Sequence, residues 1–228
     1  MENKFKTSEF ILASLLTSYP DEAFSEDVQL LLEEKTDFLP KKLRADVEAI
    51  VKNEERINDL RSEYLALFDS GRGVAPLYET EYGRQRALFK ANELSAISGF
   101  YHAFGFELGG EESAREMPDH ISVELEFYAL LLLKQEHLEV AADAQGIEIV
   151  ASAREKFLRD HLGRFVSSIL ERPGVGESET YGDILRFVED LVQSECKALG
   201  IAPERAAWIA GEDEAGEVTC GGTVGCLK

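Results

Sequence analysis

Pro118, Asp119 and His120 form a compact group of side chains whose types could do chemistry. They lie in the segment EMPDHISVELEFY, at the start of an apolar stretch with helical periodicity. Glu124 follows His120 by four residues, a spacing at which its carboxylate could orient or charge the imidazole on one helix face. A catalytic centre, a metal site and a surface that recognises another protein all fit these residues. An ion pair that only stabilises a helix start fits them equally well.

The positions of the histidines argue against a metal site built on one helix. None has a second histidine three or four residues away, as a motif such as HExxH requires. The order DH at 119–120 also reverses the HD order of metal phosphohydrolases. We therefore expect no bound metal and no cofactor. A metal-dependent hydrolase centred on His120, Asp119 and Glu124 is the alternative hypothesis. The four histidines are His102, His120, His137 and His161.

Motifs for other kinds of catalysis are missing from the sequence. It contains no GxSxG nucleophile elbow and no GxxxxGK or GxGxxG phosphate-binding loop. Cys196, Cys220 and Cys226 are an odd number of thiols late in the chain, which favours reduced cysteines over a disulfide framework. The sequence assigns them no role. We expect a protein without catalytic activity.

The elements that must position these residues are predicted to be helices. Helical periodicity dominates and no alternating strand pattern appears, which indicates an all-α single-domain bundle of about seven or more helices with long functional loops. Residues 1–200 are expected to form this domain, and 201–228 an acidic, flexible tail that contains Gly and Cys. Pro118 should occupy the first turn of its helix, with Asp119 at the positive end of the helix dipole. The expected helices are 8–19, 25–35, 43–68, 88–104, 118–133, 147–170 and 181–199, and the expected long loops are 69–82, 107–117 and 171–180.

The charge balance restricts the class of partner. Twenty-four Lys and Arg face 44 Asp and Glu, and the net charge of -20 repels nucleic acid and anionic membranes but attracts a basic peptide. The same acidity could serve solubility alone. The longest unbroken apolar run, FYALLLL at 127–133, is too short to span a membrane. We expect a cytoplasmic protein that does not insert into membranes.

Three segments resemble, in order and spacing, the TorD/DmsD/NarJ family of redox-enzyme maturation chaperones. They are YLALFDSGRGVAPLYETEYG at 64–83, EMPDH at 116–120 with SVELEF after it, and FLRDHLGRF at 157–165. The resemblance covers about residues 8–200 and is closer to the NarJ-like and type II dimethyl-sulfoxide-reductase-family chaperones than to TorD. Phe165 stands where relatives commonly have Trp, and nothing after residue 200 matches a family pattern.

This resemblance implies a cytoplasmic chaperone that has no catalysis of its own. Such proteins bind the N-terminal, often twin-arginine, signal peptide of the apo catalytic subunit of a molybdenum enzyme of the DMSO reductase family. They hold the subunit until its molybdopterin cofactor is inserted and hinder premature export. A subunit that stays in the mature complex is a third hypothesis. The client is left open, and a homodimer is compatible with the sequence because helix exchange between copies leaves no mark in it.

Carried over position by position, the family's binding surface uses Tyr78 and Glu79 from the loop and the Pro-Asp-His group from the helix start. The carboxylates of Glu79, Glu81 and Asp119 would suit arginine side chains. Leu77, Tyr78 and Tyr82 would form an apolar wall, and Asp119 and His120 would face outward. The predicted peptide-binding residues are Tyr78, Glu79, Glu81, Tyr82, Pro118, Asp119, His120 and Glu124.

Overall fold

The chain is helical throughout the part that can be described. The computed structural model describes residues 2–33, 38–69, 75–83, 86–108 and 116–209. Within these ranges it contains α-helices and short helical turns but no β-strand, so the predicted all-α, single-domain bundle is confirmed. The α-helices are α1 (Glu2–Thr17), α2 (Phe24–Glu33), α3 (Lys41–Val51), α4 (Glu54–Tyr64), α5 (Arg86–Ala103), α6 (Ile121–Val140), α7 (Ala144–Phe157), α8 (Val166–Leu170) and α9 (Thr180–Ala198).

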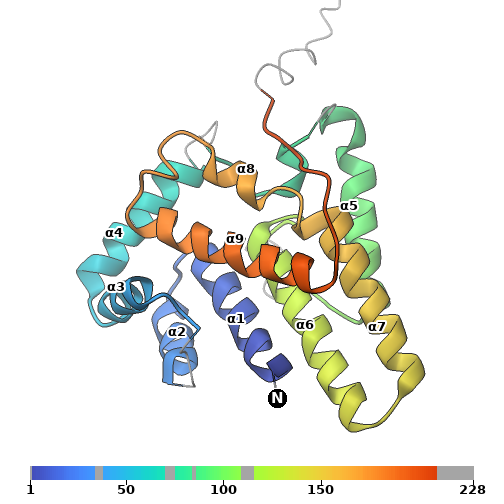
Figure 1. The fold of residues 1–228 in the computed structure, drawn as a ribbon. Coiled ribbons are helices and arrows are strands. Elements are labelled where there is room, and N and C mark those ends of the chain that lie inside the picture. Colours follow the sequence, from blue (N-terminus) through green and yellow to red (C-terminus); the bar gives the residue numbers. More distant parts are fainter. Residues whose placement is uncertain (1, 34–37, 70–74, 84–85, 109–115, 210–228) are drawn as a thin grey trace, which may run out of the picture.

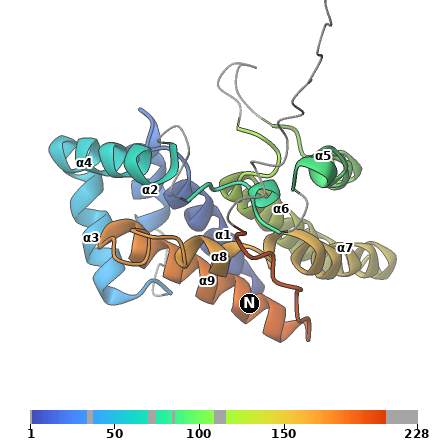
Figure 2. The ribbon, with the colours of Figure 1, turned by 90° about the horizontal axis from the view of Figure 1, so that it is seen from above.

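Helix α6 is the central element because it is apolar on most sides. Its first half is buried almost without interruption, as a helix without a polar face requires. It packs against α1 and α7, and α9 crosses in front of α1 (Figure 1). Seen from above, α2, α3 and α4 lie on one side of this centre and α5 and α7 on the other (Figure 2). No helix among the described residues is long and apolar enough to cross a bilayer.

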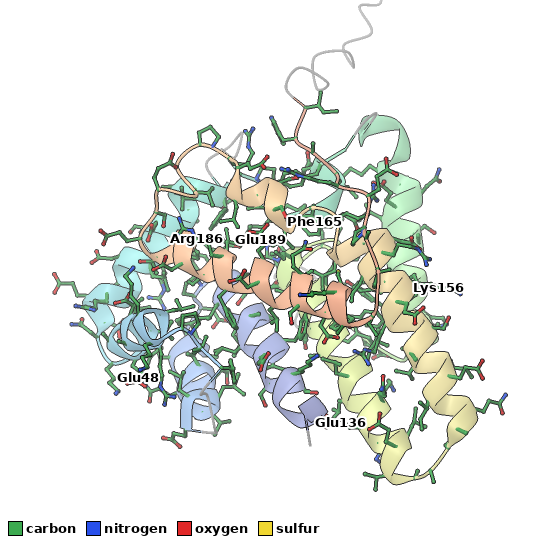
Figure 3. All side chains as sticks on the ribbon, in the orientation of Figure 1. Glu48, Glu136, Lys156, Phe165, Arg186 and Glu189 are labelled. Atoms are coloured by element: carbon green, nitrogen blue, oxygen red, sulfur yellow. The ribbon has the colours of Figure 1, made fainter. Side chains whose placement is uncertain are left out.

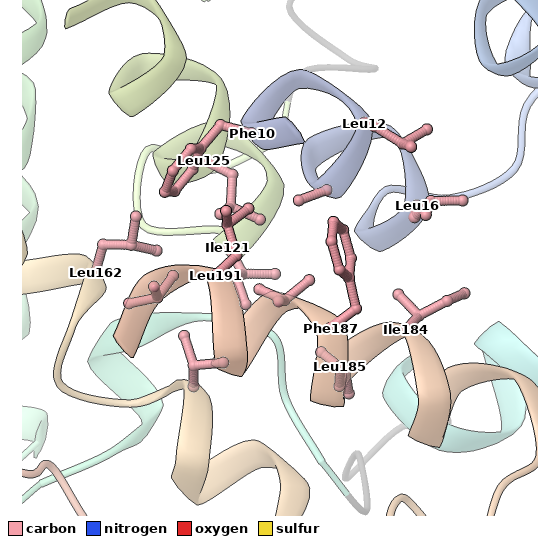
Figure 4. Packing of buried hydrophobic residues seen from close by; sticks show 14 of the residues in the cluster. Phe10, Leu12, Leu16, Ile121, Leu125, Leu162, Ile184, Leu185, Phe187 and Leu191 are labelled. Carbon is pink, nitrogen blue, oxygen red and sulfur yellow. The ribbon is translucent and has the colours of Figure 1, made fainter. Parts of the chain in front are cut away.

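The core lies where α1, α6 and α9 meet. Charged side chains such as Glu48, Lys156 and Arg186 project from the outside of the ribbon, whereas Phe165 is fully buried (Figure 3). Burying one large apolar side chain stabilises the fold by about 1.5–3 kcal/mol. The close view shows the apolar side chains of these helices packed together (Figure 4); they include Phe10, Leu12, Leu16, Ile121, Leu125, Ile184, Leu185, Phe187 and Leu191.

The prediction of a single helix over 43–68 is wrong, because the helix is interrupted after Val51. Helix α3 ends at Val51, and Asn53 begins α4 as an N-cap whose side chain accepts hydrogen bonds from the backbone N–H groups of Glu55 and Arg56. The apolar repeat continues across the break, which is why periodicity alone did not reveal it. Helix α4 then runs into a π-helical turn, η1 (Leu65–Asp69).

The helix predicted for 147–170 is also divided. Helix α7 is followed by a second π-helical turn, η3 (Leu158–Leu162), and then by the short helix α8. Gly163 lies between them, where a Cβ atom would come 2.3 Å from the carbonyl oxygen of Leu158. The backbone at this position therefore requires glycine. By contrast, α9 ends as predicted, with Gly200 at a φ of 70°.

The prediction that Pro118 occupies the first turn of a helix is wrong as well. Helix α6 begins at Ile121, and His120 is its N-cap. Pro118 and Asp119 belong to the turn before the helix, in which the N–H of His120 donates to the carbonyl of Met117 at 3.0 Å.

Residues 201–209, here called the C-terminal strap, pack against the helical body. Ala206 is buried, and its N–H donates to the carbonyl of Arg164 at 2.9 Å. The remainder of the predicted tail, 210–228 with Cys220 and Cys226, lies outside the described residues. The division of the chain at residue 200 stays a prediction.

Candidate functional site

A cleft of about 570 Å³ opens where the end of α1, the turn η1 and the start of α6 approach one another. Its walls are largely aromatic and its rim is acidic, with the carboxylates of Asp21, Asp69 and Glu116. No Lys or Arg of the described residues lines it. The other lining residues are Ser18, Tyr19, Tyr64, Leu65, Phe68, Leu77, Tyr78 and His120.

The cleft depends on a backbone pairing between two segments that are distant in the sequence. Residues 75–83, here called the bridging segment, lie against the turn before α6. The N–H of Glu79 donates to the carbonyl of Asp119 at 2.8 Å, and the N–H of Ile121 donates to the carbonyl of Leu77 at 2.9 Å. These bonds form an isolated antiparallel bridge between Tyr78 and His120. The two motifs that the sequence singled out are thereby joined.

Asp119 faces inward, so the prediction that it faces outward is wrong. Its side chain is 1% exposed and accepts hydrogen bonds from the N–H and the Oγ1 of Thr80, at 3.2 and 2.6 Å. A buried carboxylate needs such donors because its desolvation is costly. They fix the 3-10 turn η2 (Glu79–Glu81) of the bridging segment.

His120 is buried too, contrary to the outward orientation predicted for it. Its Nδ1 accepts from the N–H of Ser122 at 3.3 Å and lies 2.7 Å from the Ser122 Oγ, while Nε2 lies 3.4 Å from the Tyr64 Oη. The ring meets Tyr78 edge to face, with centroids 5.0 Å apart. Burial lowers the pKa of His120 to about 4, and nearby Asp119 opposes this shift only in part. The imidazole is therefore neutral at physiological pH.

The carboxylate of Glu124 makes no hydrogen bond with His120, although the four-residue spacing allows one. It is fully buried, and neither carboxylate oxygen has a hydrogen-bond partner of good geometry among the described residues. Burial, and next the nearby carboxylate of Glu79, raise the pKa of Glu124 well above its usual value. Burial therefore favours the protonated form of Glu124.

Glu79 contacts two side chains that are distant from it in the sequence. Its Oε2 lies 3.0 Å from Nδ1 of His161, which the turn η3 brings inward, and its Oε1 accepts from Nη1 of Arg164 at 3.5 Å. The sequence prediction assigned no role to either residue. Both belong to the FLRDHLGRF motif, and its mixture of acid and base beside buried apolar positions is the signal that could have found them.

The remaining predicted residues lie around the bridging segment. Tyr78 is half-buried and its Oη donates to Oε2 of Glu116 at 3.0 Å. The Lys90 Nζ donates to Oε1 of the partly exposed Glu81 at 2.6 Å. Tyr82 is buried and donates to the Pro76 carbonyl at 2.7 Å. Pro118 is half-buried and its carbonyl accepts from the Oη of Tyr101 at 2.6 Å.

The structure thus gathers the predicted residues in one region, but among them only Tyr78 and His120 line the cleft. The assignment of these residues to peptide binding stays a prediction. Sequence reasoning missed most of the cleft. Tyr64, Phe68 and Asp69 lay in a quoted motif, whereas Tyr19 and Asp21 follow another helix and could be placed only by the tertiary fold.

The hydrolase alternative rested on Asp119, His120 and Glu124 acting together. Their side chains turn to different partners, since Asp119 bonds to Thr80, His120 contacts Ser122 and Tyr64, and Glu124 lies beside Glu79. Within the described ranges, no three His, Cys, Asp or Glu side chains are grouped so that they could hold a metal ion.

Comparison with known proteins gives consistent matches. The family model described as nitrate reductase delta subunit matches residues 21–171. The chain is 33% identical over 149 residues to the chlorate reductase assembly chaperone protein of Ideonella dechloratans, covering 64% of this chain and 74% of that protein. It is 33% identical over 141 residues to the selenate reductase assembly chaperone protein of Thauera selenatis, covering 62% and 70%.

One solved structure is also similar. It is described as a candidate redox enzyme maturation protein from Archaeoglobus fulgidus. The match has a TM-score of 0.46 and 23% sequence identity, and it covers 82% of this chain and 93% of the other.

Proposed function

Because the chain belongs to the nitrate reductase delta subunit family, the NarJ/TorD type that its motifs resemble, we propose that it is an assembly chaperone for the catalytic subunit of a molybdenum-containing oxidoreductase. The two curated relatives are named as assembly chaperones of a reductase, and neither is named as an enzyme. The protein therefore acts by binding a client rather than by catalysing a reaction.

The client's N-terminal, twin-arginine type segment binds in the cleft. The observation that carries this proposal is the combination of aromatic walls with the carboxylates of Asp21, Asp69 and Glu116. Planar guanidinium groups suit both carboxylates and aromatic faces, and the apolar stretch of a signal segment suits the aromatic walls. Binding takes place in the cytoplasm, before export, and holds the apo subunit while its cofactor is inserted.

The predicted site residues divide into two roles under this proposal. Tyr78 contacts the peptide from the wall of the cleft, and Glu81 and Pro118 lie at the surface nearby. The buried carboxylates of Glu79 and Asp119 already have partners in His161 and Thr80. They hold the bridging segment in place rather than receive an arginine.

A binding experiment tests the proposal. A peptide with two consecutive arginines before an apolar stretch is titrated calorimetrically into the full chain, and we expect micromolar or tighter binding. Glu116→Gln and Tyr78→Ala should each weaken it about tenfold, a loss of ~1.4 kcal/mol. Glu155→Gln is the matched control, because it removes an exposed carboxylate from α7, which contributes nothing to the cleft.

The outcomes distinguish two claims: that the protein binds the signal segment, and that the cleft is where it binds. Absence of binding to the wild-type chain would refute recognition of the signal segment. Binding that is equally tight in Glu116→Gln and Tyr78→Ala would place the peptide elsewhere and remove the cleft assignment.

A further inference from the structure

The C-terminal strap lies beyond the part of the chain that the family model matches, yet it contacts the segment that carries Tyr78. We propose that the C-terminal strap is a positioning element of the cleft, which clamps the bridging segment and so holds Tyr78 in its binding geometry. This inference rests on the proposed function for its effect on binding. Figure 1 shows the strap leaving the end of α9 and passing beside α8.

Backbone hydrogen bonds tie the strap to two elements at once. The N–H of Gly83, at the end of the bridging segment, donates to the carbonyl of Ala207 at 2.9 Å. The N–H of Ala206 donates to the carbonyl of Arg164 at 2.9 Å, and Nε of Arg164 donates to the carbonyl of Glu204 at 3.2 Å. The strap therefore joins the bridging segment to the connection between η3 and α8.

Aromatic contacts reinforce the same junction. The Trp208 ring meets Tyr82 of the bridging segment edge to face, with centroids 5.9 Å apart. The guanidinium of Arg172 lies 3.9 Å from the centroid of the Trp208 ring, which fixes the indole in place. Tyr82 in turn packs against Phe165 and donates to the carbonyl of Pro76, at the start of its own segment. A change at Trp208 is thus transmitted to both ends of the bridging segment.

Arg164 forms a second connection between the strap and the bridging segment. Besides its two bonds with the strap, its Nη1 donates to Glu79, the residue next to Tyr78. The bonds of Glu79 and Leu77 to the start of α6 do not involve the strap. Loss of the strap contacts should therefore loosen the bridging segment without unfolding the helices.

Hydrogen exchange tests the clamp without any peptide. In the full chain, Trp208→Ala should speed exchange of the amides of Tyr82 and Gly83 while the amides of α1 and α6 keep their protection. Trp208→Phe keeps a ring against Tyr82 and should restore slow exchange. Phe38→Ala is the control, because it removes an aromatic ring that stacks on Phe187 of α9, a contact that involves neither the strap nor the bridging segment.

Peptide binding tests the effect on the cleft. Trp208→Ala should weaken binding of the twin-arginine peptide about fivefold or more, and Trp208→Phe should recover the wild-type affinity. Trp208 is the single tryptophan of the chain, so in the wild type its fluorescence emission should shift when the peptide binds.

The results distinguish this inference from the proposed function. If the wild-type chain binds no peptide, the proposed function fails, while the exchange measurement still tests the clamp. If the wild type binds but Trp208→Ala binds equally well, or if its exchange in the bridging segment is unchanged, the strap is not a positioning element.

Discussion

Two hydrogen bonds join Asp119 to Thr80 across 39 residues of sequence, and they hold the bridging segment, which carries Tyr78, against the start of α6. Asp119, His120 and Glu79 have the side chains of an active site, but each is buried and bonded inside the protein. Buried polar groups that are fully paired give a structure a unique register, because any other arrangement leaves one of them without a partner. At this site, they specify how the bridging segment meets α6.

The neutral state of His120 predicts a loss of stability in acid. Its folded pKa of about 4 lies below the usual 6.5, because burial disfavours the charged ring. Below pH 6.5 the unfolded chain binds a proton there that the folded chain does not, so stability falls between pH 6.5 and 4, by up to roughly 3 kcal/mol at pH 4. Urea unfolding of the wild type and of His120→Asn across this range measures the effect.

His120→Asn is the appropriate comparison, since an asparagine oxygen can cap α6 in the same way. All other titratable residues are shared by the two proteins, so the difference between the two pH profiles belongs to residue 120. We expect the free energy of unfolding of the variant to fall less steeply between pH 6.5 and 4. Parallel profiles would show that burial does not lower the pKa of His120.

The raised pKa of Glu124 predicts the opposite pH dependence, a loss of stability as the pH rises. Its folded pKa is raised, so the stability linked to its protonated form is complete below its usual pKa of 4.5 and is lost as the pH rises toward the folded pKa. Glu124→Gln keeps the shape and the neutral state, and its amide can donate to Glu79. The variant should be more stable than the wild type at pH 7 and equally stable near pH 4, by thermal unfolding. A variant that is less stable than the wild type at pH 7 would contradict the raised pKa of Glu124.

At the scale of elements, π-helical turns supply residues to this region. Turn η1 ends α4 with Phe68 and Asp69 in the cleft, and turn η3 ends α7 with His161 against Glu79. Such turns often occur at functional sites because an extra residue redirects the side chains that follow. Both helices could otherwise have continued, as their apolar periodicity suggested.

The sequence predicted the helices better than their ends. Periodicity located the helices α6 and α9, since it depends only on residues close in the chain. The break before α4 had a local signal, Asn53 followed by Glu54 and Glu55, which the continuing apolar repeat obscured. The turns η1 and η3 had none, because they form in response to packing.

The sequence indicated which two motifs contribute to one surface, but neither the rest of the cleft nor the orientation of the side chains. The motifs at 78–82 and 118–120 are joined by the bridge between Tyr78 and His120. The direction of each side chain depends on the register of the bridge between Tyr78 and His120, and neither segment alone contains that information. This is why Asp119 was expected at the surface and lies inside.

Gly163 tests the junction between η3 and α8. In Gly163→Ala the new Cβ would lie 2.3 Å from the Leu158 carbonyl oxygen and 2.6 Å from Pro203 of the strap, so backbone must move. We expect a loss of about 1–3 kcal/mol, as for other overpacked sites, in urea unfolding. Gly99→Ala is the matched control. It lies within α5 with no atom within 4 Å of its new Cβ, and should stabilise by up to about 1 kcal/mol. Equal changes in the free energy of unfolding for the two variants would contradict tight packing around Gly163.

At the scale of the whole molecule, the net charge creates a negative electrostatic field around the protein. The chain has a net charge of -20, and the described lining of its cleft carries carboxylates but no Lys or Arg. Such a field raises the rate at which a basic segment arrives and disfavours acidic ones, while the contacts in the cleft set how long the segment stays.

This field predicts how peptide binding depends on salt. Because the Debye length falls from about 30 Å at 0.01 M to about 10 Å at 0.1 M ionic strength, affinity for a twin-arginine peptide should drop steadily over that range. A peptide with glutamine at both arginine positions should bind more weakly and show little salt dependence, since its apolar contacts are not screened. In Glu116→Gln the slope for the arginine peptide should be shallower than in Glu155→Gln, which carries the same net charge. Identical slopes in these two variants would show that overall charge alone attracts the peptide and that the acidic rim of the cleft has no particular part in binding.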